Sequence, residues 1–253
     1  MLLNLIIFVS LFASSLSLTS ITTMSSSPTI KLTYFDIEGA GEPIRLALLL
    51  AGVEFEDCRI KFPEWGDLKA STPYGQLPVM EVDGGEMKAQ SGAMLRYCGT
   101  LGNKSLYPTE KLYEIEEALG VIGDLNNAFM PGLYMGMRPH LFGYEEGSQA
   151  TDEGKKIIEQ VRTAFVQTEL PKYLGFLEAL LEKSGGDWLV AGDSPTIADC
   201  FAVPNIRRFT CGFIDHVPVD CLESHPKVVA YLERFCALPE FKGRYSKGVG
   251  ASQ

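Results

Sequence analysis

Hydrophobic and polar positions divide the chain into two regions with different periods. From residue 29 to residue 104, short β-rich runs alternate with short stretches of helical period. After Tyr107-Pro108, only long stretches of helical period follow. This pattern predicts a small mixed α/β domain over residues 28–104 and a larger all-helical domain over residues 110–253.

The first region predicts the element order βαβ-ββα. Strands are expected over Thr29–Phe35 and Glu56–Ile60. The helix between them has Pro43 in its first turn and ends at Gly52. Because a crossover helix connects them, these two strands are expected to be parallel.

A hairpin and a helix complete the predicted α/β domain. A short irregular helix is expected over Trp65–Ala70. The runs Val79–Val82 and Glu86–Ala89 flank a glycine turn and predict two antiparallel strands. Ser91 is then expected to cap the last helix of the domain, because serine is a favoured N-cap.

The second region predicts helices over about residues 111–134, 153–183 and 197–209, and a further helix from Pro226. Pro171 lies inside the second of these. It is expected to kink or break that helix, because proline removes one backbone hydrogen-bond donor.

Residues 1–27 are expected to be a leader that takes no part in the fold. They carry no charged side chain, and the apolar run Leu2–Ala13 is shorter than the ~20 residues of a membrane-spanning helix. The segment is either a signal peptide, which would send the chain into the secretory pathway, or an extension upstream of a start at Met24. In the second case the protein would be cytoplasmic.

Charge and cysteine usage exclude several functions. The net charge of -10 disfavours nucleic acid and anionic membrane surfaces as partners. The cysteines form no CxxC pair and the three histidines have no ligand spacing, so no metal site is expected. We expect the six cysteines to be free thiols; they are Cys58, Cys98, Cys200, Cys211, Cys221 and Cys236.

Three short features could bind a ligand. Pro78 at a strand entrance is either an ordinary turn residue or part of a cis Leu77-Pro78 bond, which would leave the backbone of Leu77 open to pair with an extended peptide. Gln90-Ser91 begins a helix and could hold a carboxylate. Tyr34 ends a strand, where it either packs or donates its hydroxyl proton to an anion such as a thiolate.

These features together resemble the cytosolic glutathione transferases, most closely the sigma class. The resemblance extends over about residues 29–245 and includes the segment from Trp188 to Asp199, in which Thr196 and Asp199 have the spacing of a capping box. The runs that carry it in the first domain are Leu32–Phe35, Glu42–Arg45, Trp65 with Lys69, Tyr74–Pro78, Glu81–Gly84 and Gln90-Ser91.

The resemblance implies a thioredoxin-like domain followed by an all-helical domain. It implies a homodimeric detoxification enzyme that conjugates the thiolate of glutathione, its co-substrate, to hydrophobic electrophiles, with no permanently bound cofactor. Tyr34 would stabilise the thiolate. The implied glutathione-binding residues are Tyr34, Trp65, Lys69, Gln76, Leu77, Pro78, Gln90 and Ser91.

Further roles follow from the same resemblance. The acceptor site would lie between the domains, lined by Gly39, Ala40, Met130 and Tyr134. The three methionines between residues 130 and 137 suit varied apolar ligands, although at least one is expected to be ordinary helix core. Tyr74 is either an aromatic key that enters the neighbouring subunit or an exposed loop residue. Arg45 is expected to be a structural ion-pair partner.

Two positions depart from the family pattern. The turn Glu38–Gly41 lacks the arginine that sigma-class enzymes often carry there, which lowers the expected activation of the thiol. The acidic residue that the family lends across the dimer to the glutathione amine also has no clear match. Gly120 lies near its place, and Asp124 follows one turn later.

Other functions on this fold stay open. One is a glutathione-dependent isomerase, such as a prostaglandin D synthase. Another is a non-enzymatic ligand carrier or structural protein, like the related lens crystallins. A structural protein has no physical need for the whole glutathione-binding set, which favours an enzyme. A thiol transferase would need a cysteine near Tyr34, and Cys58 is the nearest candidate.

Overall fold

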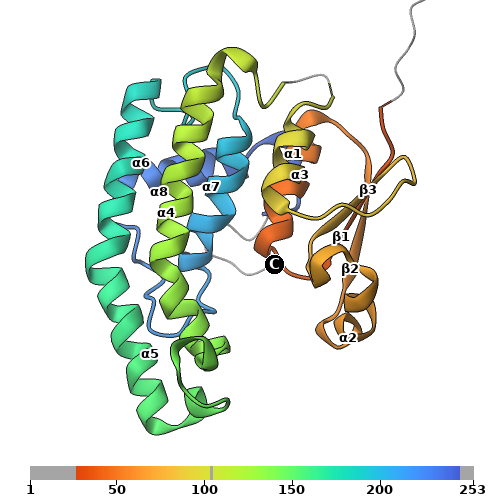
Figure 1. Cartoon of the computed structure of the whole chain (residues 1–253). Coiled ribbons are helices and arrows are strands. Elements are labelled where there is room, and N and C mark those ends of the chain that lie inside the picture. The colour runs from red at the N-terminus through yellow and green to blue at the C-terminus, as the bar shows by residue number, and fades with distance from the viewer. Residues whose placement is uncertain (1–26, 103–104, 246–253) are drawn as a thin grey trace, which may run out of the picture.

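The computed structural model describes residues 27–102 and 105–245. A small sheet with its helices lies beside a bundle of longer helices (Figure 1). Residues 1–26, and with them both explanations of the leader, lie outside the described residues. No helix in the described part of the chain is long and apolar enough to span a membrane.

The sheet has the predicted mixed topology. Strand β1 (Ile30–Phe35) is central, parallel to β2 (Phe55–Ile60) and antiparallel to β3 (Val79–Val82). Ile30 pairs with Phe55 on one side and with Val82 on the other. The predicted parallel pairing of the first two strands is therefore confirmed.

Helix α1 (Glu42–Ala51) connects β1 and β2 and is buried almost throughout. It ends as predicted at Gly52, whose φ of 67° allows its N–H to reach the carbonyl groups of Leu48 and Leu49. Helix α3 (Ser91–Gly99) packs beside it, and the helical domain covers its outer side (Figure 1).

Two local predictions in this domain are wrong. The expected strand Glu86–Ala89 is only a single antiparallel bridge between Met80 and Lys88, because residues 83–88 are exposed and have no apolar face to bury. Ser91 is not the cap of α3 but its first residue. Gln90 occupies the N-cap with φ 80° and no capping side-chain hydrogen bond.

The short helix expected from Trp65 is split. Helix α2 (Trp65–Leu68) is followed directly by a 3₁₀ turn, Lys69–Ser71. The tighter turn is the irregularity that the sequence predicted, since 3₁₀ turns commonly end short helices.

The helical domain contains α4 (Leu112–Met137), α5 (Asp152–Ala164), α6 (Leu170–Ser184), α7 (Ile197–Arg207) and α8 (Pro226–Cys236). The interruption predicted at Pro171 is a π-helical turn, Phe165–Glu169, directly before α6. Proline in the first turn of α6 has no N–H to donate backward, and the wider turn accommodates this loss.

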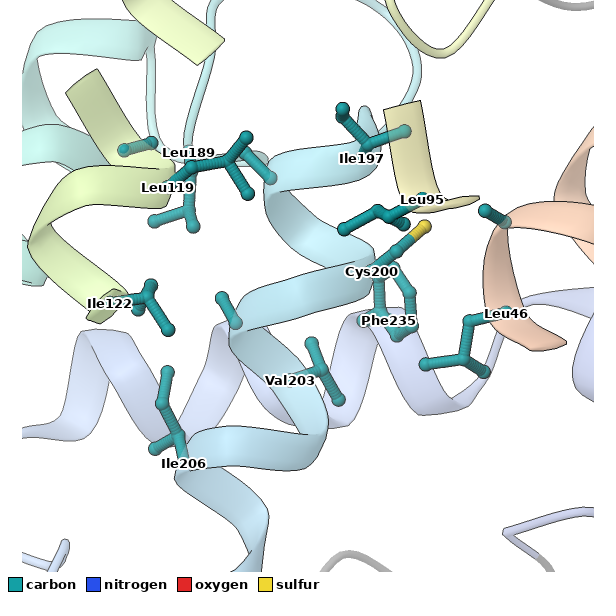
Figure 2. Packing of buried hydrophobic residues seen from close by; sticks show 14 of the residues in the cluster. Leu46, Leu95, Leu119, Ile122, Leu189, Ile197, Cys200, Val203, Ile206 and Phe235 are labelled. Carbon is teal, nitrogen blue, oxygen red and sulfur yellow. The ribbon is translucent and has the colours of Figure 1, made fainter. Parts of the chain in front are cut away.

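Helix α7 forms the centre of the shared core. Its residues Cys200, Val203 and Ile206 are fully buried. Figure 2 shows them surrounded by side chains from both domains: Leu46 of α1, Leu95 of α3, Leu119 and Ile122 of α4, and Phe235 of α8. One continuous apolar core therefore holds the two domains in fixed relative positions.

The predicted capping box of α7 is confirmed. The Asp199 carboxylate accepts hydrogen bonds from the backbone N–H of Thr196 at 2.7 Å and that of Leu189 at 3.0 Å, and from the Tyr231 hydroxyl at 3.0 Å. Burial raises the Asp199 pKa, and these hydrogen bonds oppose the rise. A single buried carboxylate thus fixes the start of the central helix, the preceding loop and α8.

Replacing Asp199 by alanine should lower the free energy of unfolding by about 2–5 kcal/mol, because several buried donors lose their acceptor together. Denaturant titration at pH 7 measures the change. Asp193→Ala is the matched control, since Asp193 is exposed in the same segment and should leave the midpoint unchanged. Equal midpoints for both variants would contradict the role given to Asp199.

The six cysteines should titrate as six free thiols after denaturation without reductant, because the structure has all six unpaired. Cys98 should react slowly in the native protein, since burial raises the pKa of its thiol to about 12. A thiol-specific chromogenic reagent measures both quantities. Fewer than six thiols in the denatured chain would instead indicate disulfides formed in a secretory compartment.

Candidate active site

Tyr34 lies near the end of β1 beneath the 3₁₀ turn Gly39–Gly41, and 8% of its surface is exposed. A Cβ atom at Gly39 would lie 2.6 Å from the Tyr34 hydroxyl oxygen, and the φ of Gly39 is 41°. Both facts require glycine at this position. The turn can therefore close directly onto the phenol ring.

The hydroxyl of Tyr34 is held by the turn above it. The backbone N–H of Ala40 donates a hydrogen bond to the Tyr34 oxygen at 3.1 Å. In the described part of the chain, no acceptor takes the hydroxyl proton. Burial raises the Tyr34 pKa, so the group is a neutral phenol at pH 7 with its proton available to a ligand.

Arg45 is the cation whose charge acts on the pKa of Tyr34. Its guanidinium carbon is 5.8 Å from the centre of the Tyr34 ring, and its charge acts to lower the Tyr34 pKa against the effect of burial. Arg45 is fully buried, pairs with Asp57 at 2.9 Å and donates to the carbonyl of Ile37 at 2.8 Å. It is thus the structural ion-pair partner that the sequence predicted, and it also anchors the turn.

Trp65 begins α2, and Lys69 directly follows that helix. Trp65 stands edge-on to Phe35, the neighbour of Tyr34, with 6.0 Å between the ring centres. Lys69 is exposed, and a Cβ built on Gly75 would be 3.4 Å from its side chain. An exposed ammonium group and a half-buried indole therefore line the end of the sheet on the α2 side (Figure 1).

The Leu77-Pro78 peptide bond is cis, which is the more specific of the two predicted alternatives. Gln76 before it is extended, Pro78 is buried, and β3 begins at Val79. Within the described residues, the N–H and C=O of Leu77 pair with no other group. These two groups form a short free edge that an extended peptide can extend.

Gln90 and Ser91 form the amino end of α3, in the same domain as Tyr34. The Gln90 carbonyl accepts from the N–H groups of Ala93 and Met94, both at 3.0 Å. In the described residues, the N–H groups of Ser91 and Gly92 have no such partner. A ligand carboxylate would meet free donors and the positive end of the helix dipole here.

The predicted acceptor residues come from both domains. Gly39 and Ala40 are exposed on the turn, and Tyr134 of α4 is close enough to act on the Tyr34 pKa, which it raises. Met130 is half-buried. Of the other two methionines, Met135 is core at 5% exposure and Met137 is 56% exposed, so the expectation of at least one core methionine is correct.

Two ion-pair groups near the turn were not predicted. Arg207 of α7 pairs with Glu38. Burial raises the pKa of the Glu38 carboxyl, and the charge of Arg207 offsets part of that rise. Glu42 is fully buried and accepts from Arg244 at 2.7 and 2.5 Å and from the Tyr245 hydroxyl at 3.0 Å. The only signal in the sequence was a charged residue on an otherwise apolar helix face.

The comparisons with known proteins agree with this geometry. The Glutathione S-transferase, N-terminal domain family matches residues 30–100, and the Glutathione S-transferase, C-terminal domain family matches residues 147–245. Glutathione S-transferase 1 of Ascaris suum is 38% identical over 216 residues, which cover 85% of this chain and 94% of that protein. The chain belongs to the glutathione S-transferase family.

Two solved structures refine the comparison. The prostaglandin synthase D of Nilaparvata lugens matches with a TM-score of 0.67 and 26% identity, over 85% of this chain and 96% of that one. A glutathione S-transferase of Necator americanus, described as monomeric, matches with a TM-score of 0.62 and 30% identity, over 85% and 94%.

The predicted fold class and activity are therefore confirmed. The protein has a thioredoxin-like domain with a small mixed sheet followed by an all-helical domain. It is a glutathione transferase that uses glutathione as co-substrate without a permanently bound cofactor.

Proposed function

We propose that this chain conjugates the glutathione thiol to hydrophobic electrophiles, with Tyr34 as the group that stabilises the thiolate. The observation that carries the proposal is the hydrogen bond from the Ala40 N–H to the Tyr34 oxygen, which leaves the phenol proton for the sulfur. Detoxification of apolar electrophiles is the matching physiological role. Residues 28–104 would bind glutathione and residues 110–253 would bind the acceptor, with 1–27 as a separate leader.

The tripeptide would lie along the edge of the sheet. The free N–H and C=O of Leu77, ahead of Pro78, suit the cysteinyl backbone, and the exposed ammonium of Lys69 suits the glycyl carboxylate, with Trp65 and Gln76 beside them. The unpaired donors at the start of α3 suit the γ-glutamyl carboxylate at Gln90-Ser91. The thiol would then lie at Tyr34.

Activation of the thiol would rest on a hydroxyl, with little help from a nearby cation. The turn Glu38–Gly41 lacks the arginine that related enzymes often carry there, and Arg45 is already paired with Asp57. One hydrogen bond stabilises a thiolate less than a hydrogen bond plus an unpaired charge. We expect a pKa of about 7 for the bound thiol, with activity that rises between about pH 6.5 and 8.

A glutathione-dependent isomerase of the sigma class is the second candidate. The similarity to a prostaglandin synthase D supports it, and both reactions need the same thiolate. Product analysis separates them, because isomerisation returns glutathione unchanged whereas conjugation consumes it.

Tyr34→Phe should lower kcat/KM about 10- to 1,000-fold and leave the affinity for glutathione nearly unchanged, because the hydroxyl contacts only the sulfur. The measurement is conjugation of a chlorodinitrobenzene-type electrophile across pH 6.5–8. The pKa of the bound thiol should rise toward its value in water.

Tyr173→Phe is the matched control for this change. It removes the same atom from α6, in the helical layer on the far side of α4 from the sheet (Figure 1), and should leave the rate unchanged. A Tyr34→Phe protein with wild-type rates throughout the pH range would reject Tyr34 as the catalytic residue.

We propose further that the active form is a homodimer in which Tyr74 enters the neighbouring subunit. Tyr74 is 79% exposed and held outward by a φ of 58°. A groove of about 280 Å³ lies between α3 and α4. It is lined by Leu95, Leu119, Gly120, Gly123 and Phe201, together with Gly92 and the ion-paired Arg96 and Glu116. Its small and apolar residues suit an aromatic ring, and a two-fold axis would provide two such contacts.

Tyr74→Ala should weaken self-association by about 2 kcal/mol or more, as expected for the loss of a buried aromatic anchor. Sedimentation of the wild type and the variant at micromolar concentration measures it. Tyr144→Ala, which removes a 42% exposed tyrosine from the connection between α4 and α5, is the control. A monomeric wild type at this concentration would exclude the dimer.

A further inference from the structure

Arg208 directly follows the last residue of α7, and its guanidinium packs on two aromatic rings of the core. Its guanidinium carbon is 4.9 Å from the ring centres of both Phe129 and Phe209. Its Nη2 donates to the Asn126 side-chain oxygen on α4 at 2.7 Å. The residue as a whole is partly exposed, its Nε is fully buried, and within the described residues its Nη1 donates no hydrogen bond.

No carboxylate balances this charge. Among residues 27–102 and 105–245, no acidic side chain forms an ion pair with Arg208, and its buried Nε has no hydrogen-bond partner. Burial lowers the Arg208 pKa to about 10, and no acid counteracts the shift. The group is still protonated at pH 7.

The other arginines with little exposed surface each have a carboxylate nearby. Arg45 pairs with Asp57, Arg207 with Glu38 and Arg244 with Glu42, and Arg162 lies 3.9 Å from Asp215. A buried cation without a counter-charge is unfavourable, because its lost hydration is not replaced. An anion supplied from outside would replace that hydration at Nη1, which donates no hydrogen bond within the described residues.

The position of Arg208 connects it to the acceptor wall. Asn126, Met130 and Tyr134 follow one another at four-residue intervals on α4, so they form one stripe along that helix. Tyr134 acts electrostatically on Tyr34, whose pKa it raises, and it belongs to the acceptor residues proposed above. Eight residues of helix place Asn126 about 12 Å from Tyr134 along the axis.

We propose that Arg208 and Asn126 bind the carboxylate of the acceptor, and that this enzyme prefers electrophiles with an apolar chain ending in a carboxylate about 12 Å from the reacting carbon. The guanidinium Nη1 and the Asn126 amide N–H groups would donate to the anion, and the chain would lie along Met130. This assignment rests on the proposed function, since it names the substrate class of the same acceptor site. The chemistry at the sulfur is unchanged.

Asn126→Asp is the sharpest test, because it places a carboxylate on Arg208 while retaining the shape of the side chain. Decanoate and decanol are the probes, titrated calorimetrically into the full chain at pH 7. The wild type should bind decanoate at least about tenfold more tightly than decanol. Asn126→Asp should remove that preference, and Arg208→Gln should do the same.

Asn127→Asp is the matched control, since it makes the same change of charge at an exposed position on the same helix. It should leave both affinities at the wild-type values. The thermal midpoint of each variant checks that the fold is intact. Equal binding of decanoate and decanol to the wild type, or a preference that survives in Asn126→Asp, would overturn the proposal.

Displacement tests the location of the anion site. S-hexylglutathione, which extends an alkyl chain from the sulfur into the acceptor site, should displace decanoate, and S-methylglutathione should not. Failure of S-hexylglutathione to displace decanoate would overturn the link to the acceptor. A protein without conjugating activity that still binds decanoate through Arg208 would instead refute the proposed catalysis and retain the anion site.

Discussion

The burial of the Glu42 carboxylate is the constraint around which the two domains are arranged. Glu42 begins α1, directly after the turn that covers Tyr34, and has no exposed surface. A buried carboxylate is tolerated only when several donors surround it. Those donors come from Arg45 in its own helix and from Arg244 and Tyr245 at the end of the helical domain. The turn over Tyr34 is therefore held by residues of both domains.

The features that could be predicted from the sequence are those fixed by nearby residues. The capping box at Thr196 and Asp199, the glycine end of α1 at Gly52 and the interruption at Pro171 each depend on a few consecutive positions. The strand predicted at Glu86–Ala89 was wrong because alternation and a glycine turn do not reveal whether a face will be covered.

The contacts that could not be predicted join distant parts of the chain. Arg207 and Glu38 are separated by 169 positions, and Arg244 and Glu42 by 202. No local pattern specifies such pairs. In the candidate site, residue types and order pointed to Tyr34, but the Ala40 N–H that orients its hydroxyl depends on the closure of the turn. The unpaired charge of Arg208 likewise emerges only when the helices are packed.

The 202 positions that separate Glu42 from Arg244 have a consequence for biosynthesis. During translation, β1, β2 and α1 leave the ribosome long before Arg244 and Tyr245, so Glu42 has no distant donors while the first domain is being made. The first domain can collapse early, but the surroundings of Glu42 are completed only once Arg244 and Tyr245 have emerged and packed. A nascent chain stalled before Arg244 would therefore lack the distant donors that complete the hydrogen bonding of Glu42, the residue that follows the turn over Tyr34.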